Sequence, residues 1–98
     1  MDTNTPAAAN RFIVTVIGRD RVGIVAKISA VMAEQGVNIV DISQTIMQDM
    51  FTMVMLAQAT EKGFQLAAFQ AAMDAAAREL GVEAKVMHED AFRYMHRI

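Results

Sequence analysis

Two apolar runs limit the folds open to this chain. "RFIVTVI" spans Arg11 to Ile17 and "MFTMVMLAQ" spans Met50 to Gln58. In each run the apolar residues occupy successive rather than alternating positions, so both faces of an extended strand would be apolar. Val, Ile and Phe also favour strands over helices. The chain therefore needs a sheet in which these two strands are central.

Two helices are predicted, one after each of these strands. The first begins near Val22 and ends at Gly36, since glycine suits the position just after a helix. Its apolar face consists of Ile24, Val25, Ile28, Val31 and Met32. The second follows Thr60-Glu61-Lys62-Gly63 and runs to about Leu80, and Gly81 caps it. Its residues at helical spacing are Phe64, Ala68, Ala71, Ala72 and Ala75.

Two further segments alternate between apolar and polar residues, which is typical of edge strands. In Val37 to Met47 the two faces are Val40, Ile42 and Ile46 against Asp41, Ser43 and Thr45. Gln48-Asp49 then predicts a tight turn into the second apolar run. Val82 to His88 alternates as the fourth strand. Asp90 is a suitable N-cap for a short last helix carrying Phe92 and Met95.

The resulting β-α-β-β-α-β order is that of the ferredoxin-like α+β fold. Its four-stranded antiparallel sheet has the strand order 4-1-3-2, with two helices on one face. This order makes strands one and three central, as their composition requires. The opposite face of these strands must be covered by the short C-terminal helix or by a second subunit. We expect one domain over residues 11–98 and a flexible tail over residues 1–10, "MDTNTPAAAN".

Composition excludes several kinds of function. A formal net charge of -2 argues against a broad nucleic-acid-binding surface. The absence of cysteine excludes disulfides, thiolate metal sites and cysteine nucleophiles. No apolar run reaches the length of about 18 residues expected of a membrane-spanning helix, and the first residues do not resemble a secretory signal. We expect a cytoplasmic protein without a cofactor.

The stretch "VIGRDRVGIVAKI" sets Gly18 and Gly23 five positions apart, as in the first half of a phosphate-binding P-loop. A P-loop then requires a lysine and a hydroxyl residue, and this chain has Ile24 and Val25 at those positions. A nucleotide site is therefore not expected. The loop still leads into a helix N-terminus, which favours an anion such as a carboxylate. Asp20 is the expected N-cap, which would place Gly23 at the third helical position.

Together with "EQGVNI" before the second strand, the loop "GRDRVGI" resembles the ACT domain, a small amino-acid-sensing βαββαβ module of metabolic enzymes and regulators. The resemblance covers about Phe12 to Glu89. It implies that a small amino acid binds between the glycine loop of one subunit and the start of strand two in its neighbour. The matching positions are Gly18, Arg19, Asp20, Arg21, Val22, Gly23, Ile24, Asn38 and Ile39.

The resemblance also implies a homodimer whose ligand regulates a metabolic enzyme or another regulator. The chain departs from the family at two positions. Some serine-sensing members carry a side-chain donor where this chain has Gly18, and an asparagine where it has Asp20. Serine is therefore not favoured, and the Asp20 carboxylate suits either the ligand's ammonium group or a helix cap. No fused catalytic or DNA-binding segment is evident, so the chain resembles a stand-alone ACT protein.

Other sites remain as alternatives. Met47, Met50, Met53 and Met55 have a spacing reminiscent of copper sites, but a hairpin places them on different faces, and methionine is a common core residue. His88, Glu89 and His96 would share a metal only if the last helix folded back on the strand end. Arg19 and Arg21 would hold a carboxylate, or else be solvated.

Two other functions are left open. Acylphosphatases share this length and topology, but the loop lacks their V-Q-G-V-x-[FY]-R pattern and its arginine. A pure interaction subunit with a vestigial ligand site is the second alternative.

Overall fold

The computed structural model describes residues 10–95, and of residues 93–95 the backbone only. The predicted tail therefore lies outside the described residues, except for Asn10. The elements are β1 (Arg11–Arg19), α2 (Ile24–Glu34), β2 (Val37–Met47), β3 (Met50–Ala59), α3 (Leu66–Leu80), β4 (Val82–His88) and α4 (Glu89–Met95). The strand order is β2-β3-β1-β4 with antiparallel neighbours, which confirms the predicted ferredoxin-like topology.

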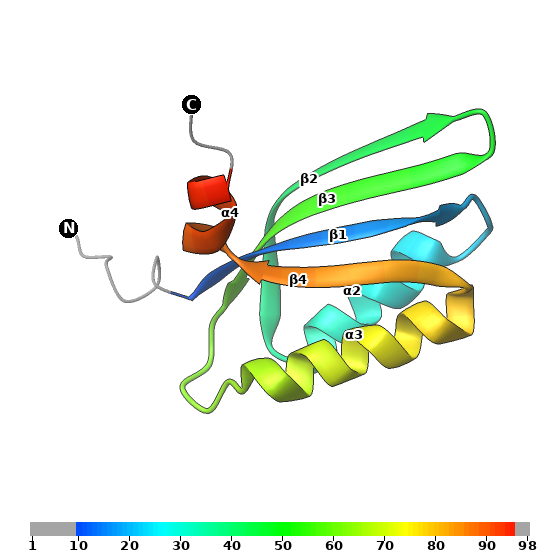
Figure 1. Ribbon diagram of the computed structural model, residues 1–98. Helices are drawn as coiled ribbons and strands as arrows, with labels where there is room; N and C mark the ends of the chain where they lie inside the picture. Colours follow the sequence, from blue (N-terminus) through cyan, green and yellow to red (C-terminus); the bar gives the residue numbers. More distant parts are fainter. Residues whose placement is uncertain (1–9, 96–98) are drawn as a thin grey trace.

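The elements form two layers and a short additional helix (Figure 1). Helices α2 and α3 lie side by side against one face of the sheet, as predicted. Helix α4 lies on the other side, beside the ends of β1 and β4. It covers one end of the face that α2 and α3 leave free. Further along that face, Ile17 and Val54 are exposed.

The core lies between the sheet and the two long helices. From β1 it receives Val14 and Val16, and β3 contributes Phe51, Met53, Met55 and Ala57. Helix α2 buries Ile24, Ile28, Val31 and Met32 as predicted, but Val25 is exposed. Helix α3 buries Phe69, Met73, Ala76, Ala77 and Leu80. The predicted stripe in α3 was wrong, because Ala68, Ala71 and Ala75 are exposed and the larger side chains take the core positions.

A β-bulge at Val40 changes the alternation of β2. Ile39 pairs with Ala57, and Asp41 pairs with Leu56, so one residue of β2 has no partner on β3. Before the bulge, Ile39 faces the helices; after it, Ile42 does. In the sequence, two adjacent apolar residues, Ile39 and Val40, interrupt the apolar–polar alternation here, and the prediction of a regular strand overlooked them.

Two predicted boundaries were wrong. Gly18 was expected in a loop, but it belongs to β1 and pairs with both Phe51 and Val82. Asp90 was expected to cap the last helix, but α4 begins at Glu89. There the ring Nδ1 of His88 accepts a hydrogen bond of 3.1 Å from the Asp90 N–H.

Gly18 is required by close packing at the centre of the sheet. A Cβ atom there would lie 2.6 Å from Val82 Cγ1 and 3.0 Å from Val82 Cα. The second of these is a backbone atom, so a rotamer change of Val82 cannot relieve the overlap. The β1–β4 register therefore depends on the absence of a side chain at position 18.

We expect Gly18→Ala to lower the free energy of unfolding by about 1–3 kcal/mol, the usual cost of overpacking. Gly63→Ala is the matched control, because nothing lies within 4 Å of a Cβ atom at Gly63. Chemical denaturation monitored by circular dichroism measures both variants. Equal stability of the two variants would contradict the packing role of Gly18.

Candidate functional site

The loop between β1 and α2 contains Asp20, Arg21, Val22 and Gly23. Gly23 is the N-cap of α2 and has a φ of 96°, in the left-handed region. The prediction of Asp20 as N-cap was wrong, and Gly23 precedes the helix instead of occupying its third position. A glycine is used here because residues with a Cβ atom rarely adopt this backbone conformation.

The N-terminus of α2 has no side-chain cap. Gly23 lacks a side chain, and no acidic residue lies in the first turn. The Gly23 carbonyl accepts the first helical hydrogen bond, 2.9 Å from Lys27 N. The N–H groups of the first turn thus receive no side-chain acceptor, and they lie at the positive end of the helix dipole. The Val22 side chain beside them is fully exposed.

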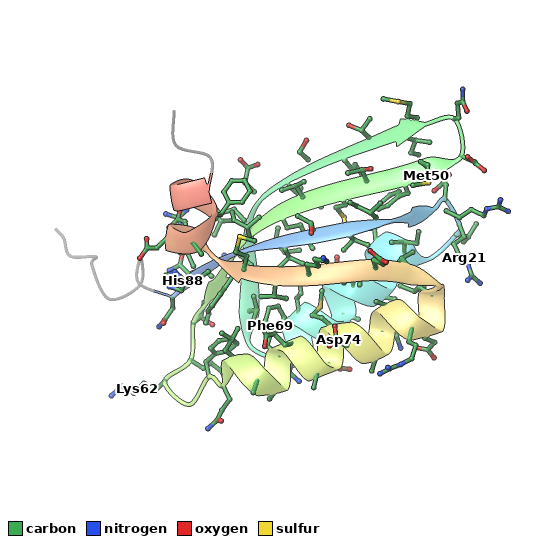
Figure 2. The ribbon with its side chains drawn as sticks, viewed as in Figure 1. Arg21, Met50, Lys62, Phe69, Asp74 and His88 are labelled. Atoms are coloured by element: carbon green, nitrogen blue, oxygen red, sulfur yellow. The ribbon has the colours of Figure 1, made fainter. Side chains whose placement is uncertain are left out.

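Two neighbouring turns hold this loop in place. The Asp20 N–H donates a 2.8 Å hydrogen bond to the carbonyl of Asp49 in the β2–β3 turn. Arg19 Nη2 lies 3.7 Å from Asp49 Oδ2 at the surface. Arg21 Nη1 donates a 2.7 Å hydrogen bond to the carbonyl of Leu80, the last residue of α3. Figure 2 shows Arg21 at the end of the molecule opposite His88. Both arginines therefore have partners within the chain.

The structure does not bring the two predicted halves of the site together in one chain. Asn38 is exposed on the edge strand β2, between Val37 and Ile39, which pack into or against the core. Gly23 and Asn38 lie at opposite ends of α2. Its 11 residues span about 16 Å. A small amino acid is too short to contact both positions of one chain.

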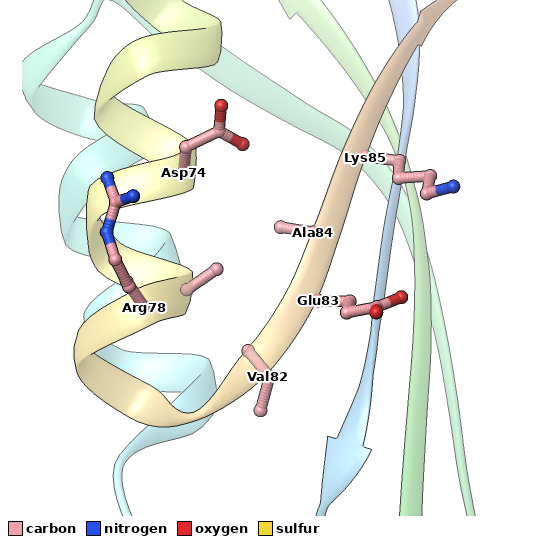
Figure 3. A pocket seen from close by; sticks show the side chains of 7 residues that line it. Asp74, Arg78, Val82, Glu83, Ala84 and Lys85 are labelled. Carbon is pink, nitrogen blue, oxygen red and sulfur yellow. The ribbon is translucent and has the colours of Figure 1, made fainter.

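The hollows of the described surface lie elsewhere. A groove of about 340 Å³ runs between α3 and β4, with Ala77, Val82 and Ala84 at its base (Figure 3). Asp74 and Arg78 border it on the helix side. A smaller hollow of about 150 Å³ lies on the other face of the sheet, around Ile13, Val54 and Leu56. Neither includes the glycine loop.

The alternative metal sites receive no support from the geometry. Met53 and Met55 are buried in the core, and Met47 and Met50 are exposed at the hairpin, which agrees with the predicted separation. Within residues 10–95, no three His, Asp or Glu side chains form a group suited to a metal. His96 lies outside the described residues.

Sequence reasoning missed the partners of the loop. Asp49 was predicted only as a turn residue, and Leu80 only as a helix end. Their carbonyl groups hold the loop because β1 pairs on both sides and brings both turns to the same end of the sheet. No side-chain pattern reports a backbone carbonyl, so no sequence signal was available for these contacts.

Comparison with known families decides the relationship. Residues 10–87 match the family model of the ACT domain. The chain belongs to the ACT domain family. A UPF0237 protein of Methanosarcina mazei is 70% identical over 92% of this chain and 98% of its own length. One from Clostridium acetobutylicum is 43% identical over 88% of this chain and 97% of its own length.

Solved ACT structures share the fold. An ACT domain protein from Streptococcus pneumoniae is 36% identical, with a TM-score of 0.75 over 86% of this chain and 94% of that chain. The regulatory subunit of aspartate kinase from Thermus thermophilus, in its ligand-free form, is 25% identical. Its TM-score is 0.62, over 80% of this chain and 50% of that one. None of the helices described for this ACT domain is long and apolar enough to cross a membrane.

We expect Gly23→Ala to lower the free energy of unfolding by about 1 kcal/mol through backbone strain alone, because a Cβ atom there meets no other atom within 4 Å. Gly23→Asn should cost less, since asparagine tolerates the left-handed region. Thermal denaturation of both variants measures the difference. If both were as stable as the wild type, the left-handed N-cap would be wrong.

Proposed function

We propose that this ACT domain is a regulatory module that binds a small amino acid and has no catalytic activity of its own. The observation that carries the proposal is the uncapped N-terminus of α2 behind a left-handed glycine. Such an end offers backbone N–H donors to a carboxylate without a competing side chain. The absence of a Cβ atom at Gly23 lets the ligand approach the backbone closely.

The loop carries the charges that an amino acid requires. Its carboxylate binds at the helix N-terminus, and its ammonium group binds the exposed carboxylate of Asp20. Arg21 has further N–H donors beyond the one that Leu80 accepts, because a guanidinium group has five. The exposed Val22 side chain supplies an apolar contact for the ligand or for a neighbouring subunit.

The proposed working unit is a homodimer formed beside α2 and the edge strand β2. Lys27 Nζ is 2.9 Å from Glu79 on α3, and this hydrogen bond raises the pKa of Lys27. Val25 and Ser29 lie on the opposite side of α2, towards β2. There Ile42 and Ile46 also leave exposed apolar surface on the helix side of the sheet. These side chains form a surface that a second subunit would bury.

The ligand site in this proposal is shared between the two subunits. A two-fold axis beside α2 runs the two copies of the helix antiparallel. It brings Gly23 of one subunit towards Asn38 of the other, which no single chain achieves. Asn38 then supplies both a donor and an acceptor to the ligand.

The relatives support a regulatory role. The Thermus thermophilus neighbour is the regulatory subunit of aspartate kinase. By analogy, this chain would act on a metabolic enzyme or regulator. The analogy rests on the similarity of the fold and of the sequence, 25% identical over 80% of this chain.

A thermal-shift screen against the common amino acids tests the ligand class. A ligand at one hundred times its Kd should add about 2.7 kcal/mol of stability. Nucleotides and acyl phosphates form the comparison set. A stabilising nucleotide together with inactive amino acids would contradict the proposal, and turnover of an acyl phosphate would identify an enzyme.

Mixing subunits tests the shared site. We expect Gly23→Asn and Asn38→Ala each to abolish binding of the amino acid found in the screen. A heterodimer of the two variants has one site with both changes and one unchanged site, so it should bind at half the wild-type stoichiometry, measured by titration calorimetry. Continued loss of binding in the mixture would place both residues in a site within one chain.

A further inference from the structure

In the edge strand β4, the outer backbone groups of Val82, Ala84 and Val86 form no hydrogen bond with the described residues. Ala59 N–H donates 2.9 Å to the carbonyl of Asn10, which lies opposite it. In an antiparallel ladder, hydrogen-bonded pairs alternate. Even-numbered residues of β1 therefore bond to β3, and odd-numbered ones bond to β4.

This alternation determines which N–H and C=O groups of β4 point towards β1 and which point away from it. Glu83 and Lys85 lie opposite Ile17 and Thr15, so their N–H and C=O groups point to β1. The N–H and C=O groups of Val82, Ala84 and Val86 therefore point outward, away from the sheet. Among residues 10–95, no strand lies beyond β4.

The two edges of the sheet differ in their protection. On β2, Asp41 Oδ1 accepts a 2.9 Å hydrogen bond from the N–H of Ile42, which points outward by the same alternation. A carboxylate thus occupies one edge donor, a common means of blocking strand addition. The described residues place no such group over β4. An unprotected edge of this kind is a template for another strand.

Four charged side chains surround this edge without ion-pair partners among the described residues (Figure 3). Glu83 and Lys85 extend on the face of β4 away from the helices, and Asp74 and Arg78 border the groove on α3. The groove between them has alanine side chains at its base, Ala77 and Ala84, which leave room at the sheet edge. The set contains two acidic and two basic residues, so it is complementary to itself.

We propose that β4 is an interface with a second copy of this chain, joined edge to edge by antiparallel strand pairing. A two-fold axis at Ala84 places Ala84 opposite its own equivalent and Val82 opposite Val86 of the second copy. Glu83 then lies opposite Lys85 of the second copy, and Lys85 opposite Glu83. Each of the three outward-pointing residues gains a hydrogen-bonded partner.

The charges select this register over its neighbours. Moving the axis to position 83 would place Glu83 opposite Glu83, and moving it to position 85 would place Lys85 opposite Lys85. Like charges directly opposite each other destabilise a strand pair, and opposite charges stabilise it. Of these three axes, only the one at Ala84 places Glu83 and Lys85 of both copies opposite residues of opposite charge.

The same two-fold axis also relates the α3 helices of the two copies. Three residues of β4 beyond Gly81 advance about 10 Å, which corresponds to about six or seven residues of α3. Ala84 is therefore level with Asp74 and Ala75 of α3. The axis that passes Ala84 therefore runs the two copies of α3 antiparallel beside the new strand pair.

The β4 interface uses different residues from the proposed ligand site, whose subunit contacts lie beside α2 and β2. With both interfaces present, the wild-type protein forms an assembly larger than a dimer. With the β4 interface alone it forms a dimer. The two proposals are thus separable by molar mass.

Charge reversal tests the interface. Glu83→Lys places two lysines opposite each other at this pair, and Lys85→Glu places two glutamates opposite each other. We expect each variant to associate about tenfold to several hundredfold more weakly than the wild type in sedimentation velocity. An equimolar mixture of the two variants restores both opposite-charge pairs and should regain association, as should the double variant Glu83→Lys/Lys85→Glu.

Glu61→Lys and Lys62→Glu are matched controls, because they carry the same charge changes in the loop before α3. They should associate as the wild type does. If the wild type is larger than a dimer and Glu83→Lys is a dimer, both proposed interfaces are supported. If the wild type is a dimer and Glu83→Lys is a monomer, only the β4 interface is supported. If Glu83→Lys has the same molar mass as the wild type, or if the mixture of variants does not reassociate, the proposed β4 interface is wrong. The edge of β4 would then be open to a strand of another protein.

Disulfide trapping tests directly which residues of the two β4 strands lie opposite each other. The chain has no cysteine, so Glu83→Cys and Lys85→Cys each carry a single thiol. Opposite residues of a non-hydrogen-bonded pair have Cα atoms about 4.5 Å apart, within disulfide range. With a tag on one variant, oxidation of the mixture should yield the mixed dimer in excess over either self-linked dimer. An excess of self-linked dimers would exclude the axis at Ala84.

Discussion

β1 pairs with β3 on one side and with β4 on the other, both antiparallel. The register of these two pairings determines where the neighbouring turns lie along the strand direction. Because Gly18 lies opposite both Phe51 and Val82, the end of β1 meets the β2–β3 turn and the α3–β4 turn at one level. The glycine loop that follows is fixed by backbone carbonyls from both turns. The geometry of α2's N-terminus thus derives from strand register.

The two edges of the sheet have different chemistry. At β2 the chain combines a bulge, a carboxylate on an edge N–H and exposed Ile42 and Ile46. Its apolar side chains favour association through packing, while Asp41 disfavours indiscriminate strand addition. At β4 the backbone is open, and charged residues supply the selectivity. Selection of a partner therefore rests on side-chain packing at one edge and on charge order at the other.

The sequence was sufficient for the topology because local signals agreed with the global order. Two runs apolar on both faces required central strands, and Gly36 and Gly81 marked helix ends with their left-handed backbone. The buried face of α3 was not predictable from the alanine spacing. Alanine is accepted on either face of a helix, so the positions of Phe69 and Met73 decide which face is buried.

The presence of a loop between β1 and α2 was predictable, and its N-cap was not. "GRDRVGI" contains the loop, which spans residues 20–23, but Asp20 was predicted as the N-cap. The N-cap is Gly23, because α2 begins at Ile24 and the Gly23 carbonyl accepts the first helical hydrogen bond. The bulge at Val40 was missed because Ile39 and Val40, two adjacent apolar residues, were assigned to one regularly alternating strand.

The hydrogen bond from Arg21 to Leu80 joins two regions that are far apart in the chain. Arg21 donates to the carbonyl of Leu80, which lies 59 residues later in the chain. Leu80 is the last residue of α3, just before β4 begins at Val82. Any ligand that draws this guanidinium towards a carboxylate leaves the last carbonyl of α3 without its donor, and the start of β4 is the first segment to respond. Thermodynamic linkage then requires reciprocity: whatever stabilises the α3–β4 turn changes ligand affinity by the same factor that the ligand changes the turn.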